Sequence, residues 1–348
     1  MNRTLRIETL SVGPGQAANR AVVLLHFEHP ERGPVNSPAA PAFAADLAAR
    51  LGSNVWSGTD ATVVEALTYL DRDGFATGLA VAVHPDDHEA IAAVRGALRD
   101  WSAAMRTRRV LIADTVEHDP TECRHLDAAE ASVLDFVHRG DAIVLIGARA
   151  LPATRWLAAR IEQVGGTATV VQSVAEAQAD LGDPERLSYV VVPGAHVGEA
   201  LRILRVLRAR YARLRGQHPD EFCYHATDRY EALRSVIAGS DSVLLLTGDA
   251  GAASEYAETD PFLAKAVEML KAAGVAWTFV TDPTALRPTD LSSAAVGLVP
   301  TTSASDTGVD AVLRLLSGLG PLSVRLRTLR TQSYARFSET SDRLPSHA

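Results

Sequence analysis

Two cysteines, Cys123 and Cys223, are the residues of this 348-residue sequence with the clearest capacity for chemistry. Each stands just before a stretch with a helical pattern, and Cys223 lies in "DEFCYHATDRYEALRSV" beside a histidine, a threonine, an aspartate and an arginine. Thiolates are nucleophiles and metal ligands, whereas a buried cysteine often serves only as a small hydrophobic side chain. The two thiols are therefore candidates for metal binding, for other chemistry or for packing.

Short apolar runs alternate with longer amphipathic stretches along the chain. Val/Leu/Ile runs without polar alternation, each followed by a helix, are typical of parallel sheets that helices cover on both faces. The predicted fold class is therefore α/β, with repeated strand–helix units. The runs lie at 21–27, 78–83, 109–114, 142–147, 167–171, 189–193, 242–248, 276–280 and 295–300, and helical patterns at 124–139, 152–164, 196–215 and 252–273.

Composition and charge exclude several classes of partner. With 47% hydrophobic and 22% charged residues the composition is that of a globular protein, and the formal net charge of −8 argues against nucleic acid or an anionic membrane as the main partner. No apolar run is long enough to span a bilayer. Because no export signal opens the sequence and only two cysteines occur, we expect a cytoplasmic protein without a disulfide.

Small and polar residues follow several of the predicted strands. His84 follows the run at 78–83, Gly248 and Ser254 open the stretch after 242–248, and Ser303 follows the run at 295–300. In open parallel sheets, ligands bind beyond the carboxyl ends of the strands, and free N–H groups at a helix start attract anions. These strand ends are therefore the expected place for a ligand.

The order of motifs in the last third resembles the 4-hydroxy-3-methylbut-2-enyl diphosphate reductase family, which contains iron–sulfur enzymes. Cys223, Arg229 and Ala232 keep the spacing of that family's Cys-x-Ala-Thr-x-x-Arg-Gln-x-Ala pattern. Matches to the family's later motifs are Gly248, Ser303 and Asp306.

The first two thirds resemble the same family. Cys123, a helical stretch and "VLIG" at 144–147 follow the family's order of a cysteine, a helix and a strand, and His84 matches a diphosphate-binding histidine. The resemblance spans about residues 20–325.

This resemblance implies three similar parallel-sheet βα subdomains around a pseudo-threefold axis with a central cleft. They would occupy residues 20–106, 107–217 and 218–320, between an N-terminal segment (1–19) and a C-terminal strand and polar tail (321–348). It also implies a central [4Fe-4S] cluster with Cys123 and Cys223 among its ligands, a small-molecule substrate and an electron donor protein. Soft sulfur ligands suit such a cluster, or a single soft metal ion.

The sequence departs from the family at several functional positions. The first third has no cysteine, so the third metal ligand would be a histidine, His29 being the main candidate beside His26. The family's proton-delivering glutamate falls on Ala153, and its Ser/Asn diphosphate clamp falls on Ala252, Ala253 and Ser254. Alanine cannot transfer a proton or bind a phosphate, so we do not expect the parent reaction.

Three functions are compatible with these residues. The first is a metal- or iron–sulfur-dependent, reductase-like enzyme acting on another small molecule. The second is a cluster-free protein with different chemistry in the same cleft, and the third is a non-catalytic protein that binds a ligand or a partner. Candidate acid/base groups are His84, His125, His225 and Asp228, and candidate anion ligands are His84, Thr227, Ser254 and Ser303.

The C-terminal residues suggest a strand followed by a tail. Leu322, Val324 and Leu326 alternate with polar residues, which predicts a half-buried strand returning to the sheets. Beyond Ser338 the sequence is polar, and we expect it to be mobile.

Overall fold

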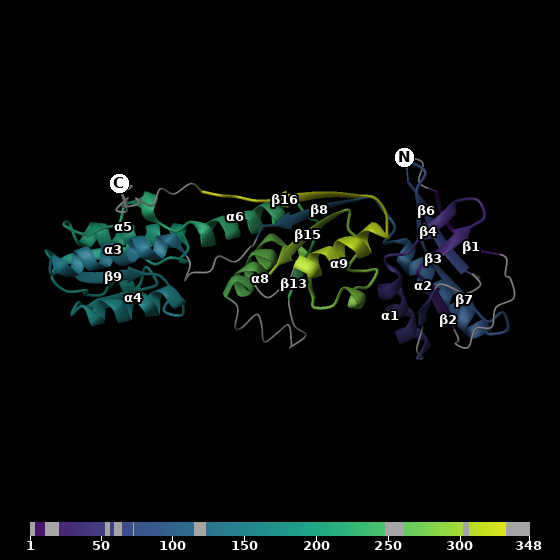
Figure 1. Ribbon diagram of the computed structural model, residues 1–348, viewed down its shortest axis with the longest axis horizontal. Helices are drawn as coiled ribbons and strands as arrows, with labels where there is room; N and C mark the ends of the chain where they lie inside the picture. Colours follow the sequence, from purple (N-terminus) through teal and green to yellow (C-terminus); the bar gives the residue numbers. More distant parts are fainter. Residues whose placement is uncertain are drawn as a thin grey trace, which may run out of the picture. The chain divides into compact units, whose positions relative to one another are not determined.

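The computed structural model describes residues 4–10, 21–52, 56–58, 65–71, 73–114, 123–247, 261–301 and 306–331 (Figure 1). The chain divides into two compact units. Unit 1 comprises Met1–Thr115 and Ala232–Arg327, and unit 2 comprises Val116–Glu231 and Thr328–Ala348. The predicted α/β class with three sheets is confirmed: two sheets lie in unit 1 and one in unit 2.

The first sheet of unit 1 is mixed, so the parallel arrangement expected for this part of the chain is wrong. β6 pairs antiparallel with both β1 and β7, and β2 also pairs antiparallel with β7; the β2–β5 and β4–β7 pairs are parallel. The strands are β1 (Thr4–Thr9), β2 (Ala21–Leu24), β3 (His26–His29), β4 (Gly33–Asn36), β5 (Trp56–Gly58), β6 (Glu65–Leu70) and β7 (Ala76–Val83).

A tight hairpin explains the antiparallel β6–β7 pair. The Asp71 carboxylate accepts the N–H groups of Asp73 and Phe75 at 2.9 and 2.8 Å, and Gly74 takes a left-handed conformation at φ 84°. A loop this short can join only antiparallel strands, because a parallel pair needs a long crossover connection.

The second sheet of unit 1 is fully parallel, in the order β14-β13-β15-β8-β16. It takes in β8, which the predicted boundaries assign to the middle subdomain, because β8 pairs with β15 on one side and β16 on the other. Its strands are β8 (Arg108–Ala113), β13 (Ser242–Leu246), β14 (Ala276–Val280), β15 (Ala295–Pro300) and β16 (Leu322–Arg327); α8 (Pro261–Ala273), η3 (Pro283–Ala285) and α9 (Asp306–Ser317) lie in the same part of the chain.

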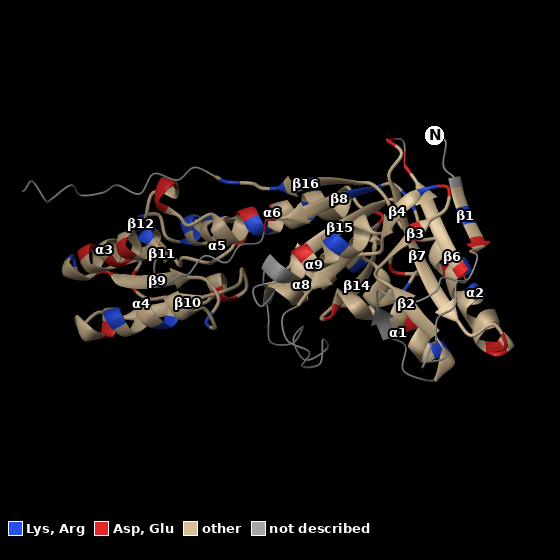
Figure 2. Cartoon of the chain, turned by 45° about the vertical axis from the view of Figure 1, so that its right-hand side comes forward, with Lys and Arg blue, Asp and Glu red and all other residues tan. Residues whose placement is uncertain are grey.

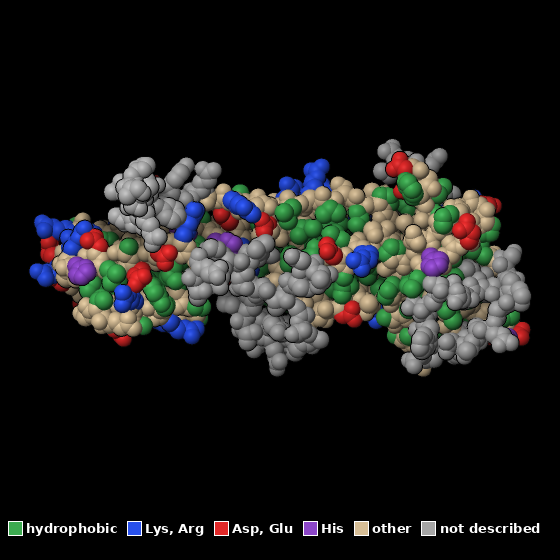
Figure 3. All heavy atoms as spheres, viewed as in Figure 1, with side chains coloured by type: hydrophobic (Ala, Val, Ile, Leu, Met, Phe, Trp, Pro, Cys, Tyr) green, Lys and Arg blue, Asp and Glu red, His purple; other side chains and the backbone are tan. Residues whose placement is uncertain are grey.

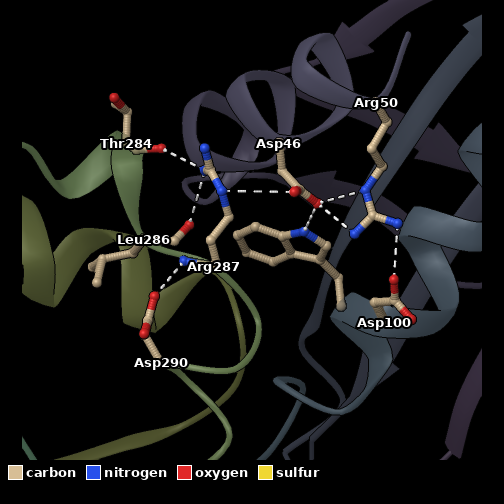
Figure 4. Close-up of polar contacts among 8 residues, drawn as sticks. Asp46, Arg50, Asp100, Thr284, Leu286, Arg287 and Asp290 are labelled. Carbon is tan, nitrogen blue, oxygen red and sulfur yellow. Dashed lines mark hydrogen bonds and ion pairs between the residues drawn. The ribbon is translucent and has the colours of Figure 1, made fainter. Parts of the chain in front are cut away.

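One hydrophobic core joins the two sheets of unit 1. It includes Phe43 of α1 (Ala40–Leu51) and Trp101 of α2 (His88–Ser102), whose rings meet edge to face at 5.7 Å, together with Leu298 of β15. At its margin the buried Asp46 accepts hydrogen bonds from Trp101 and Arg50 (Figure 4). The first sheet and the sheet formed by β8 and β13 to β16 therefore belong to one packed body.

Unit 2 is a parallel four-stranded sheet, in the order β10-β9-β11-β12. Its side chains alternate between two faces: Val144 and Val191 pack with α5, whereas Leu145 and Val190 pack with α3 and α4. Both faces are covered by helices, as the apolar strands predict (Figure 1). The elements are α3 (Arg124–His138), β9 (Ala142–Ile146), α4 (Pro152–Gln163), β10 (Ala168–Val171), η1 (Glu176–Gln178), β11 (Leu187–Val191), α5 (Val197–Arg210), β12 (Arg215–Gly216) and η2 (Pro219–Glu221).

Two segments pass between the units within the described residues. Helix α6 (His225–Ala238) begins in unit 2 and continues into unit 1 after Glu231. The chain leaves β16 at Arg327 and returns to unit 2. The strand predicted at the C-terminus is present, but the expectation that it is half-buried is wrong, since Val324 and Leu326 are 44% and 61% exposed at a sheet edge. The tail expected to be mobile lies outside the described residues.

Among the described residues, no helix combines the length and apolar character needed to cross a membrane.

A buried cysteine pair as candidate functional site

The two cysteines meet inside unit 2, although they are a hundred positions apart in the sequence. Cys123 is the N-cap residue of α3, with an extended backbone (φ −75°, ψ 113°), and Cys223 lies two residues before α6. The side chains of the two cysteines interact with each other, and this interaction shifts the pKa of both. Both are free thiols and are buried, with 2% and 4% of their surface exposed.

The pair lies in the apolar layer between the sheet and helices α3 and α4. The same cluster contains Val190 and Val192 of the β11 segment and Ala153 of α4. The backbone N–H of Gly194, just beyond β11, acts on the sulfur of Cys223. The cysteines are thus close to the carboxyl end of a parallel strand, where ligand sites of such sheets are usually found.

The interaction between the two thiols shifts their pKa values in opposite directions. The pKa of Cys223 is lowered to about 5, first because Cys123 donates a hydrogen bond to its sulfur, then through the N–H groups of His225 and Gly194 and the charge of His125, while burial acts in the opposite direction. The pKa of Cys123 is raised, because the same hydrogen bond and burial hold its proton. The pair therefore carries one thiolate and one thiol near neutral pH.

Two histidines accompany the cysteines at the helix starts. The Nδ1 of the buried His125 lies 3.3 Å from the carbonyl oxygen of Glu221, and His225 is the first residue of α6. The sequence contains a signal for this arrangement that pattern reading missed, because Cys-x-His occurs twice, at 123–125 and at 223–225, each time at the start of a helix.

Two other predicted site residues have structural partners in unit 2. Both carboxylate oxygens of Asp228 accept hydrogen bonds at 2.7 Å from the N–H and the hydroxyl of Thr331, so this carboxylate anchors the returning chain. The hydroxyl of Thr227 accepts the N–H of Val197 at 2.9 Å and thereby caps α5. These contacts occupy the groups assigned to acid/base chemistry and to anion binding.

His29 has its own partners in unit 1. Its Nδ1 accepts the N–H groups of Glu31 and Arg32, both at 3.1 Å, so its Nε2 carries a hydrogen and donates to Glu8 at 2.9 Å. Both ring nitrogens are therefore engaged in hydrogen bonds, and His29 as the third metal ligand stays a prediction. His84 is also in unit 1, with its side chain 59% exposed. Ser254 and Ser303 lie outside the described residues.

Several arginines after β11 have partners of their own. Arg202 pairs with Glu199, Arg208 donates to the hydroxyl of Tyr189 at 3.0 Å, and Arg213 pairs with Glu185. Basic and acidic residues both occur along the helices of unit 2 (Figure 2). On the face of unit 2 seen in Figure 3, acidic and basic side chains are interspersed. Partnered charges of both signs are typical of a solvated protein surface.

A protein metal centre usually needs three or four ligand side chains around one ion. Within the part of the chain that the structure describes, no three His, Cys, Asp or Glu residues are placed to hold one ion. The cysteines therefore fit two ligand positions. They do not by themselves fit a cluster that is attached through three protein ligands.

Comparison with known protein families identifies the family of this chain. The model of the LytB protein family matches residues 76–317, which is more than half of the chain and includes both thiols. This chain belongs to the LytB family.

Other LytB-family proteins similar to this chain are named 4-hydroxy-3-methylbut-2-enyl diphosphate reductases. One from Chromohalobacter salexigens is 26% identical over 68% of this chain and 71% of its own length; one from Phenylobacterium zucineum is 26% identical over 49% of this chain and 52% of its own. The chain thus spans only about half the length of some relatives. A solved structure of a diphosphate reductase from Plasmodium falciparum has a TM-score of 0.47 at 14% identity, covering 71% of this chain and 81% of that one.

Proposed function

We propose that this LytB-family protein uses Cys123 and Cys223 as thiolate ligands of a soft metal ion or iron–sulfur cluster, and acts on a small molecule other than the diphosphate of its relatives. The observation that carries this proposal is the convergence of the chain's two cysteines in one buried apolar cluster beside a strand end, where their side chains interact. Packing alone gives no reason for two thiols to meet at two helix starts.

Two cysteines supply two of the four ligand positions of a tetrahedral soft metal ion. A [4Fe-4S] cluster takes its thiolates on separate irons and needs further protein ligands, so a single ion is the better fit. Bound there, the group would supply Lewis-acid or one-electron chemistry. The protein would supply the two sulfurs, a dry pocket and the N–H dipoles of two helix starts.

The surroundings of the pair argue against the parent reaction. Ala153, at the position that resembles the family's proton-delivering glutamate, is 2% exposed and packs in the same apolar cluster as both cysteines. A methyl group there cannot move a proton. The hydroxyl of Thr227, a candidate anion ligand, caps a helix. A substrate of lower charge is the better fit, and a reductive reaction would draw its electrons from a separate donor protein.

Metal analysis of anaerobically prepared protein tests this function. We expect about one equivalent of bound zinc, or of iron with visible absorption, per chain after reconstitution, and its loss in Cys123→Ser and Cys223→Ser, since an oxygen ligand holds a soft ion poorly. His29→Ala is the matched control and should retain the metal. A wild-type content below about one-tenth of an equivalent would sink the metal proposal in favour of cluster-free chemistry or ligand binding.

Turnover of 4-hydroxy-3-methylbut-2-enyl diphosphate tests the second part of the proposal. With an artificial electron donor and reconstituted protein, we expect no reduction of this compound. Replacing Ala153 by glutamate alone should not restore it, because Ala252 and Ala253 stand where the diphosphate clamp would be. Efficient turnover by the wild type would show that the parent activity is retained.

A further inference from the structure

Strand β16 forms one edge of the parallel sheet of unit 1 and pairs, among the described strands, with β8 alone. The pairing runs without a bulge from Leu322, opposite Arg108, to Arg327, opposite Ala113, and the strand contains no proline. Every residue of β16 after Leu322 is exposed. Regular, exposed edges of this kind readily pair with another extended segment.

The backbone of β16 offers hydrogen-bonding groups on the side away from β8. The N–H of Asp114 donates to the carbonyl of Arg327 at 3.0 Å, so residue 327 directs its backbone groups toward β8. Successive residues of a strand direct these groups to opposite sides, and residues 323 and 325 therefore also face β8. The N–H and C=O groups that face the open edge belong to Leu322, Val324 and Leu326.

One face of this edge is apolar. Val324 and Leu326 stand opposite Val110 and Ile112 of β8, whose side chains lie in or against the core of unit 1. Because opposed residues of paired strands share a face, the apolar face of the sheet continues beyond the core onto β16. An added strand would cover its two exposed side chains, Val324 and Leu326.

The other face of the edge is basic. Arg325 and Arg327 alternate with the apolar residues, are exposed, and have no ion-pair partner within the described part of the chain. Arg109 of β8 stands opposite Ser323 and is exposed on the same face. Figure 2 shows these basic residues along β16 and β8. Since β16 itself contains no acidic residue, acidic side chains of a partner would complement this face.

The same charges argue against a second copy of this chain as the partner. Pairing β16 with its counterpart would gather Arg109, Arg325 and Arg327 of both copies on one face of the joined sheet. Like charges that meet across paired strands are destabilising. Charged side chains on exposed edges prevent such self-pairing in many proteins.

We propose that the open edge of β16 binds an extended acidic segment of a partner protein by β-strand addition. The outward N–H and C=O groups would bond to the added strand, whose acidic side chains would face Arg325 and Arg327. Its apolar side chains would cover Val324 and Leu326. The recognised pattern is an alternation of acidic and apolar residues. Neither cysteine takes part, so the inference does not depend on the proposed metal site.

A synthetic peptide with this pattern tests the proposal. The probe is a fluorescein-labelled peptide of about nine residues in which glutamate and valine alternate, and its binding to the full chain is followed by fluorescence anisotropy at low salt. We expect a dissociation constant of roughly 10 to 100 µM that rises with added salt. The double variant Arg325→Glu/Arg327→Glu should bind at least about tenfold more weakly. Arg155→Glu/Arg205→Glu reverses two exposed arginines of unit 2 and, as the matched control, should stay within about twofold of wild type.

The backbone contribution is tested by Val324→Pro. Proline lacks the N–H that Val324 presents at the open edge, but it leaves the residues that face β8 unchanged, so the strand should form and peptide binding should be lost. Val324→Thr retains the N–H and is the control. In the wild type, the peptide should slow amide exchange at Val324 and Leu326.

Several outcomes would overturn the proposal. These are no binding at about 1 mM peptide, equal binding of a peptide with lysine in place of glutamate, and unchanged binding by Arg325→Glu/Arg327→Glu. A wild-type dimer in light scattering that Val324→Pro converts to a monomer would show that a second copy occupies the edge instead. If Val324→Pro fails to fold by circular dichroism, exchange in the wild type decides: protection of Val324 and Leu326 by the peptide supports the proposal, and its absence removes it.

Discussion

The two units each bury an ionisable centre, and the two centres differ in how their polar atoms are satisfied. In unit 1 one oxygen of Asp46 accepts hydrogen bonds from Trp101 Nε1 at 2.9 Å and Arg50 Nε at 3.1 Å, while the other lies 3.7 Å from Arg287 (Figure 4). In unit 2 the thiols of Cys123 and Cys223 depend mainly on each other and on backbone N–H dipoles.

This difference indicates that Asp46 has a structural role, whereas the cysteine pair is open to further interactions. Asp46 ties α1 to α2 and to the segment after η3, so its charge is compensated by fixed side chains from three parts of the chain. A carboxylate with all its partners in place has little to gain from a ligand. The cysteine pair holds a thiolate in an apolar layer and can be stabilised further by a cation or by a covalent bond.

Among single substitutions, the largest loss of stability is expected from breaking the Asp46 centre. Asp46→Ala leaves the buried indole N–H of Trp101 without its acceptor and removes the charge partner of Arg50. Because an unsatisfied buried donor and a broken partly buried ion pair are both costly, we expect a loss of about 3 kcal/mol in the free energy of unfolding, measured with urea.

Asp100→Ala is the matched control for this substitution. Asp100 also pairs with Arg50, at 2.8 Å, but its side chain is 58% exposed. Exposed ion pairs contribute little, so the change should stay within about 0.5 kcal/mol. Equal losses in the two variants would mean that Asp46 is no more structural than a surface charge, and the comparison between the centres would collapse.

The cysteine centre should respond to pH instead. The Cys223 pKa, lowered from 9.0 to about 5, gives the folded metal-free protein one thiolate at pH 7, visible as absorbance near 240 nm. Since the folded pKa lies below the unfolded one, the contribution of Cys223 to stability is present above pH 9 and is lost as the pH falls through 5. Cys123, with a raised pKa, contributes below pH 9 and loses its contribution as the pH rises above that value.

The paired shifts predict a stability maximum near pH 9 relative to a variant with both cysteines replaced by alanine. Between pH 5 and 9 the unfolded chain binds one proton more than the folded chain at these sites, so stability rises with pH; above 9 the order reverses. Cys123→Ala should move the Cys223 midpoint upward, because it removes the main donor. A wild-type titration with two ordinary thiol midpoints and no thiolate at pH 7 would contradict the contact itself.

The sequence allowed much of unit 2 to be predicted, and less of unit 1. The apolar runs at 142–147 and 189–193 correctly predict β9 and β11. A parallel strand that is buried on both faces consists of consecutive hydrophobic residues, so it can be recognised from its own residues alone. The placement of β8 could not be found in this way, because its partners β15 and β16 lie far along the chain. The hairpin at Asp71 has a local sequence signal, the Asp73-Gly74 pair, which is typical of tight β-turns.

The same distinction applies to the site. Both cysteines could be selected because rare thiols at helix starts are a local signal, and the family's motif order supported them. The partners of Asp228 and His29 could not be predicted from the sequence. Thr331 and Glu8 are not sequence neighbours of these residues, and neither contact produces a recognisable sequence motif. Residue type alone therefore overstated the number of free acid/base and metal-binding groups.

The smallest of the three effects concerns His29, which the structure places with Asp46 among the satisfied polar groups. His29→Ala removes the acceptor of the Glu31 and Arg32 N–H groups and the donor to Glu8, at a side chain only 1% exposed. We expect a loss of about 2 kcal/mol in the free energy of unfolding, since these bonds are few and their backbone donors lie near the surface. Metal content should be unchanged. His84→Ala, at a 59% exposed histidine, should change stability by less than about 0.5 kcal/mol.

If His29→Ala instead left stability intact and released a bound metal, His29 would belong with the cysteines as a ligand, and its hydrogen bonds in unit 1 would have to break when the metal binds.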